Sequence, residues 1–111
     1  MNRWNIPAAL ENHVIERDRQ CVYCGISFAL QNPSRGQRAS WEHIVNDARI
    51  VSAENIARCC MSCNASKGAK SLSAWLQSKY CERKGITVST VATVVADALI
   101  RPPSLLNSVP K

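Results

Sequence analysis

The sequence has no long hydrophobic segment and no export signal. Its longest mostly apolar run, residues 88–100, is too short to cross a bilayer and contains Asp97. The first five residues are not followed by an apolar core and a small-residue cleavage site, so we predict no signal peptide. We therefore expect a cytoplasmic protein that makes no membrane contact.

Acidic residues are also scarce. The 111-residue chain has 8 Asp and Glu against 14 Lys and Arg, which gives a formal net charge of +6. Such an excess of basic residues favours a polyanionic partner, and nucleic acid is the first candidate. Linker-like segments are lacking, and the only internal repeat is a short cysteine motif. We predict one small domain over residues 1–104 and a loose tail at 105–111.

Cysteine, in contrast, is abundant. Cys21 and Cys24 form one Cys-x-x-Cys pair, and Cys60 and Cys63 form another. In a reducing compartment such pairs are more often metal ligands than disulfides, and four thiolates are a common ligand set for zinc. Because four cysteines close the tetrahedron, the predicted zinc ion is structural. Cys59 competes with Cys60, but only Cys60 has the two-residue spacing to Cys63.

The sixth cysteine and the charge balance fit this interpretation. Cys81 falls in a helical stretch and is predicted to be a small buried hydrophobe. Four thiolates and one divalent zinc ion together add a charge of −2, which lowers the formal +6 to about +4. The chain therefore stays basic with zinc bound.

The first third of the chain predicts a helix and a polar loop. The helix is expected from about residue 6 to residue 17, with Asn5 or Ile6 near its cap and Pro7 in its first turn. The loop, residues 31–38, is rich in turn residues and carries two arginines.

The rest of the chain predicts a hairpin followed by helices. Strands are expected at 40–45 and 56–59, with a turn signal at 46–47. Ser71 is expected to cap either a continuation of the first of these helices or a new one. The helices are predicted at 64–70, at 72–85 with Leu72, Trp75, Leu76 and Tyr80 on its apolar face, and at 88–100 with a cap at Thr87 or Ser89.

Four segments, in this order, resemble the HNH endonuclease family. That family shows a Cys-x-x-Cys pair, an acidic residue followed by His, an Asn in the next loop, and a Cys-x-x-Cys-Asn-x-x-Lys run. The resemblance covers roughly residues 14–76. The matching segments are Cys21-x-x-Cys24-Gly25, Glu42-His43-Ile44-Val45, Glu54-Asn55-Ile56 and Cys60-x-x-Cys63-Asn64-x-x-Lys67-Gly68.

The resemblance implies an α+β fold of the small ββα-metal (His-Me finger) type, with flanking helices and a four-cysteine structural zinc site. It also implies hydrolysis of DNA phosphodiester bonds, with double-stranded DNA as the partner. His43 is then the general base that takes a proton from water, and Asn55 holds the loop and orients His43. Glu42 and Asn64 are implied to bind the catalytic Mg²⁺ or Mn²⁺.

Three further residues are expected to contact DNA phosphates. Lys67 is expected to do so from the family's final motif. Arg35 and Arg38 are expected to do so because they lie in the basic loop at 31–38.

The chain departs from the family pattern at three positions. The acidic residue is Glu42 where Asp is common, Asn46 stands where a Pro often follows, and the last motif has Asn64 rather than His, as in zinc-containing members. Two other functions stay open. One is a non-catalytic zinc-knuckle module that binds nucleic acid or protein, and the other is a structural zinc domain in a larger assembly.

Overall fold

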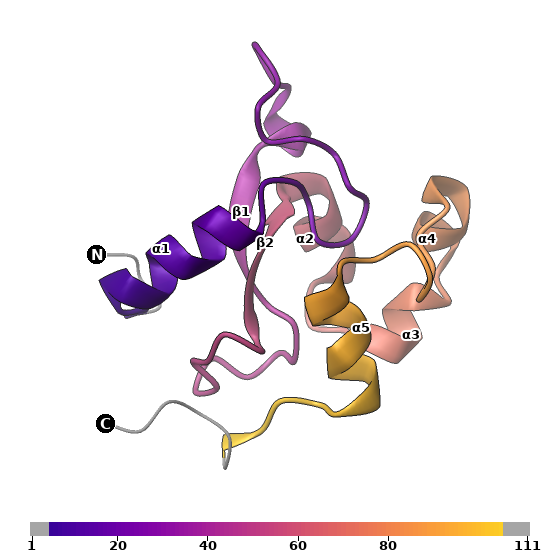
Figure 1. The fold of residues 1–111 in the computed structure, drawn as a ribbon. Helices are drawn as coiled ribbons and strands as arrows, with labels where there is room; N and C mark the ends of the chain where they lie inside the picture. The colour runs from indigo at the N-terminus through magenta and orange to yellow at the C-terminus, as the bar shows by residue number, and fades with distance from the viewer. Residues whose placement is uncertain (1–4, 106–111) are drawn as a thin grey trace.

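The computed structural model describes residues 5–105, so positions 106–111 of the predicted tail lie outside the described residues. Within this range no helix is both long enough and apolar enough to cross a membrane. Figure 1 shows the arrangement of the elements. In chain order they are α1 (Ala8–Arg17), the short 3₁₀ helix η1 (Arg35–Gln37), β1 (Ala39–His43), β2 (Ile56–Cys60), α2 (Met61–Lys67), α3 (Leu72–Leu76), α4 (Lys79–Lys84) and α5 (Thr93–Ile100).

The predicted α+β class is confirmed, since a β-hairpin packs on α2 beside four clustered cysteines. The strands are antiparallel, with Ala39 opposite Cys60 and His43 opposite Ile56. β1 ends at His43, two residues before the predicted end. The reason is that the side-chain oxygen of Asn55 accepts the Val45 N–H at 2.7 Å, which takes Val45 out of the strand ladder.

Helix α1 covers the face of the hairpin opposite α2 (Figure 1). It begins at Ala8 with Pro7 as its N-cap, whereas the sequence predicted Pro7 inside the first turn. Proline suits this position because no helical hydrogen bond requires its missing N–H. A small core cluster joins the two elements, with Ile6, Val14 and Ile56 fully buried.

Helix α2 begins three residues earlier than predicted. Cys60 is its N-cap, and the Cys60 sulfur accepts the backbone N–H of Cys63. Gly68 ends the helix with a φ of +51°, a backbone conformation that favours glycine. Asn64 consequently lies in the middle of α2 and not at its N-cap. From this position its side chain faces the hairpin.

The predicted helix at 72–85 is two short helices. Ser71 caps α3 as expected, but Ser78 accepts the N–H of Cys81 and starts α4 as a separate helix. The last helix begins at Thr93 rather than near residue 88, because the predicted cap Thr87 instead forms a turn with Thr90. These helices pack around Trp75 in the larger core cluster.

Candidate metal centre and polar site

The structure brings the four motif cysteines together. The Sγ atoms of Cys21, Cys24, Cys60 and Cys63 all lie within 4.8 Å of one another, and those of Cys24 and Cys60 are 3.7 Å apart. A zinc tetrahedron with Zn–S bonds of about 2.3 Å has edges of about 3.8 Å. The cluster therefore fits a zinc ion with four protein ligands, which leaves no open position for a substrate.

Backbone N–H groups point at the sulfurs, as they do in zinc knuckles. The N–H groups of Tyr23 and Cys24 each lie 3.4 Å from the Cys21 sulfur, and the N–H of Cys63 lies 3.4 Å from the Cys60 sulfur. Gly25 closes the first turn with a φ of +82°. Such donors stabilise thiolates, so each loop is shaped to hold a metal-bound sulfur.

The pKa values of the four clustered thiols depend on one another. Contact with Cys21 holds the pKa of the Cys24 thiol far below its ordinary value, and the same neighbour raises the pKa values of Cys60 and Cys63. Four thiolates this close together would repel one another. A divalent ion would offset that repulsion, so that all four sulfurs could bind it as thiolates. Cys59 lies outside the cluster, and burial raises its pKa. The structure thus places Cys60, and not Cys59, with the other three motif cysteines.

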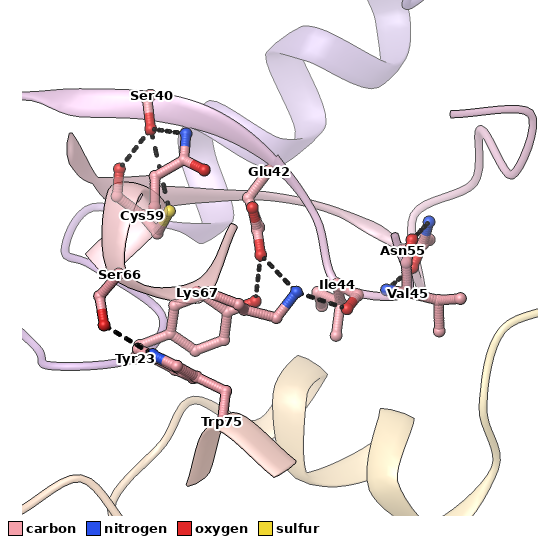
Figure 2. A network of polar contacts seen from close by, with 11 residues as sticks. Tyr23, Ser40, Glu42, Ile44, Val45, Asn55, Cys59, Ser66, Lys67 and Trp75 are labelled. Carbon is pink, nitrogen blue, oxygen red and sulfur yellow. Dashed lines mark hydrogen bonds and ion pairs between the residues drawn. The ribbon is translucent and has the colours of Figure 1, made fainter. Parts of the chain in front are cut away.

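Beside the zinc cluster, Glu42 points from β1 toward α2 and is only 6% exposed. Its Oε2 accepts a hydrogen bond from the Tyr23 hydroxyl at 2.6 Å and lies 3.1 Å from the Lys67 ammonium (Figure 2). Burial raises the pKa of Glu42, although Lys67 and Tyr23 both oppose that shift. Both of these contacts use Oε2.

Lys67 lies inside the protein. It is 1% exposed, and besides Glu42 its Nζ donates to the Ile44 carbonyl at 3.0 Å. This burial does not fit the predicted phosphate contact, because an ammonium group held by two internal partners cannot reach a DNA backbone. The sequence motif suggested an exposed cation, but the neighbouring strand supplies a carboxylate and a carbonyl that bind it instead.

Asn64 lies one helical turn before Lys67 and faces the same strand. Its Nδ2 donates to the Ser40 hydroxyl at 2.9 Å. Ser40 and Glu42 are two residues apart on β1 and therefore share one face. Glu42 and Asn64, the two expected ligands of a catalytic ion, are thus both placed in the contact between β1 and α2.

His43 is the last residue of β1 and is 7% exposed. Because successive strand residues point to opposite faces, its side chain starts on the face away from Glu42. Burial lowers the pKa of His43; the Asp47 carboxylate opposes the shift and the Lys67 ammonium adds to it. The imidazole is therefore neutral at pH 7, and it lies within electrostatic reach of Lys67 at the end of the strand.

Asn55 holds the loop that follows His43. Its side chain is fully buried, accepts the Val45 N–H, and donates to the carbonyls of Val45 and Ile50 at 3.2 and 3.1 Å. Its own backbone carbonyl accepts the N–H of Ile44. The two residues after His43 are consequently fixed by one side chain and one carbonyl.

Arg35 and Arg38 are both exposed, at either end of the turn that contains η1. The Arg38 carbonyl accepts the N–H of Met61, the first residue of α2, and an ideal Cβ on Gly36 would lie 3.4 Å from the Ser62 Cβ. The two guanidinium groups are therefore carried by a loop that packs against the start of α2.

The sequence reasoning missed two residues at this site, Tyr23 and Ser40. Tyr23 is one of the two residues between the cysteines of the first Cys-x-x-Cys motif, yet it is 1% exposed and its hydroxyl donates a hydrogen bond to Glu42. An aromatic residue with a polar tip inside a buried turn is a weak signal for such a contact. Ser40 has no local signal, since its partner Asn64 is contributed by a different element.

Comparison with protein families, with curated proteins and with solved structures finds no significant match to this chain. The structure by itself therefore supports a small α+β domain with a four-cysteine metal site that fits structural zinc.

Proposed function

We propose that this protein is a metal-dependent endonuclease of the HNH type that hydrolyses DNA phosphodiester bonds. The observation that carries the proposal is that two motif residues lie in the β1–α2 contact, while a third ends the strand that forms it. Glu42 and Asn64 lie in that contact, and His43 ends the same strand. The cysteine cluster brings the turn that holds Cys21 and Cys24 to the junction of β2 and α2, where Cys60 and Cys63 lie.

In this proposal Glu42 and Asn64 hold the catalytic Mg²⁺ or Mn²⁺. Carboxylate and amide oxygens are the hard ligands that these ions prefer. Glu42 would use Oε1, because Oε2 is held by Tyr23 and Lys67. Once bound, the ion would stabilise the negative charge on the phosphate and the leaving oxygen.

His43 accepts the proton of the attacking water. The water oxygen forms a bond to phosphorus while the bond to the 3′-oxygen breaks, and that oxygen leaves as a 3′-hydroxyl after taking a proton from solvent. The products are a 5′-phosphate and a 3′-hydroxyl. The lowered pKa of His43 supports the role, since a base must be unprotonated at the working pH.

The positive charge of the chain supports DNA as the substrate. The formal charge is +6, and Arg35 and Arg38 are exposed on a loop that packs against α2. We assign these two arginines to the phosphate contacts, because a guanidinium group binds phosphate oxygens in a bidentate manner.

A second function, a non-catalytic zinc module that binds nucleic acid or protein, is favoured by two observations. Glu42 already has a cationic partner in Lys67, and a divalent ion at the same carboxylate would lie close to that ammonium. His43 is also only 7% exposed, so a water nucleophile would have to reach a nearly covered ring.

Nicking of supercoiled plasmid by the zinc-loaded protein tests the proposal. Reactions with Mg²⁺, Mn²⁺ or Ni²⁺ are compared with reactions in which no second metal is added. We expect nicking that requires a divalent ion and is lost in His43→Ala, while zinc content stays at one ion per chain. DNA binding without nicking under all three metals would favour the non-catalytic module.

A further inference from the structure

The buried ammonium of Lys67 has two partners, and they are the two residues that flank His43. Nζ is 3.1 Å from the Glu42 carboxylate and 3.0 Å from the Ile44 carbonyl (Figure 2). Glu42 precedes His43 in the chain, and Ile44 follows it. The last residue of α2 therefore contacts the chain on both sides of His43.

The contacts of Lys67 fit neither a residue that only fills space in the core nor one that binds a DNA phosphate. Burying an ammonium group is costly unless it is paired and hydrogen-bonded, and an apolar side chain of similar length would fill the same space without that cost. With 1% exposure, Lys67 is also closed to a DNA phosphate. Its ammonium group thus interacts with the protein interior, at the end of β1.

Asn55 holds the backbone that follows His43. It binds the Val45 backbone with two side-chain hydrogen bonds, and its carbonyl accepts the Ile44 N–H. The run from Glu42 to Val45 is consequently held by α2 through Lys67 and by the loop through Asn55. His43, the base of the proposed function, lies inside this run.

We propose that Lys67 is a positioning residue for His43: by tying Glu42 and Ile44 to α2, it sets the direction of the imidazole without touching the substrate. This inference rests on the proposed function, in which His43 is the base. A misplacement of about 1 Å at a reacting group costs about 10²-fold in rate. Loss of the Lys67 contacts should therefore lower kcat and leave DNA affinity unchanged.

The kinetic test compares Lys67→Met with Lys70→Met in the zinc-loaded full chain. Lys70 is exposed just beyond α2 and serves as the matched control for removing one positive charge. We expect Lys67→Met to lose about 10²-fold in kcat with KM within about twofold, and Lys70→Met to keep the wild-type kcat. A phosphate contact would instead raise KM, and it would reduce the salt slope of DNA binding by about 0.9. That result, or an unchanged kcat, would overturn the inference.

A spectroscopic test does not depend on cleavage. Lys67→Met leaves the Glu42 charge buried without its partner, so the variant is also made in a Glu42→Gln background. The imidazole NMR signals of His43 are then compared with and without Lys67 at about pH 8.5, well above the usual histidine pKa, so that loss of the Lys67 charge does not move them by changing the protonation of the ring. The exposed His13 on α1 is the internal reference.

The two histidine signals separate this inference from the proposed function. We expect the His43 ring signals to shift or broaden on loss of Lys67, while the His13 signals stay in place. Unchanged His43 signals would overturn the positioning role. If the wild-type protein fails to nick DNA, the proposed function fails, and the NMR comparison still decides whether Lys67 positions the ring.

Discussion

Replacing Cys60, one of the four clustered cysteines that fit a zinc ion, with alanine should unfold the domain, whereas replacing its neighbour Cys59 should not. The two cysteines are adjacent and both are buried, at 2% and 0% exposure. Only Cys60 belongs to the four-sulfur cluster. Cys59→Ala is therefore a matched control that removes a buried sulfur without removing a ligand.

The expected magnitudes differ widely. Structural zinc contributes about 10–16 kcal/mol in zinc-finger peptides, while a domain of this size is stable by about 5–15 kcal/mol. Loss of zinc binding is thus comparable with the whole free energy of unfolding. Cys59→Ala removes about one methylene equivalent and leaves a small cavity, which costs about 1–2 kcal/mol. That corresponds to a fall in Tm of about 4–9 °C for a chain of 111 residues.

Metal analysis and thermal unfolding by circular dichroism measure both effects. We expect Cys59→Ala to carry one zinc per chain and to melt cooperatively at a modestly lower Tm. Cys60→Ala should carry little zinc and show no cooperative transition. Full zinc occupancy with an unchanged Tm in Cys60→Ala would refute the assignment, as would loss of zinc from Cys59→Ala.

Three further variants or conditions test the polar site and the core. Asn55→Ala removes the three hydrogen bonds of a fully buried side chain, so it should lower the free energy of unfolding by about 2–4 kcal/mol; an unchanged urea midpoint would contradict this. Because burial lowers the pKa of His43 from its usual value of about 6.5, the unprotonated base prevails at neutral pH. The nicking rate should therefore be constant from about pH 7 to pH 8 and fall only at lower pH, and an acid limb centred above about pH 7 would argue against this base. Trp75→Phe removes the hydrogen bond from Nε1 to the Ser66 hydroxyl and part of the ring packing, so calorimetry should show a loss of about 1–2 kcal/mol, with full retention of stability as the contrary result.

The features predicted well from the sequence are those set by short-range spacing. Two Cys-x-x-Cys pairs can meet at one ion only if the chain between them folds back, and the β-branched and aromatic residues at 40–45 and 56–59 supply a hairpin for that purpose. The four candidate ligands follow from the cysteine spacing, and the α+β class is what the family resemblance implies. The structure confirms the class and brings the four cysteines together.

The features that were missed depend on partners from distant parts of the chain. Lys67 reads as a basic residue at a helix end, but its burial is decided by Glu42 and Ile44, more than 20 residues earlier. Local capping caused smaller errors. The Cys60 sulfur starts α2 before Asn64, and Ser78 divides one predicted helix into α3 and α4. A cysteine is not an ordinary N-cap, so capping preferences alone do not identify this start.

The sharpest test of the central claim is chemical rescue of His43→Ala in single-turnover nicking with Mn²⁺. Removing a general base lowers the rate by about 10²–10⁴-fold. The account predicts such a loss with zinc content unchanged, followed by partial recovery when imidazole is added to the reaction. A wild-type rate in the His43→Ala variant would contradict the claim that this histidine activates the water.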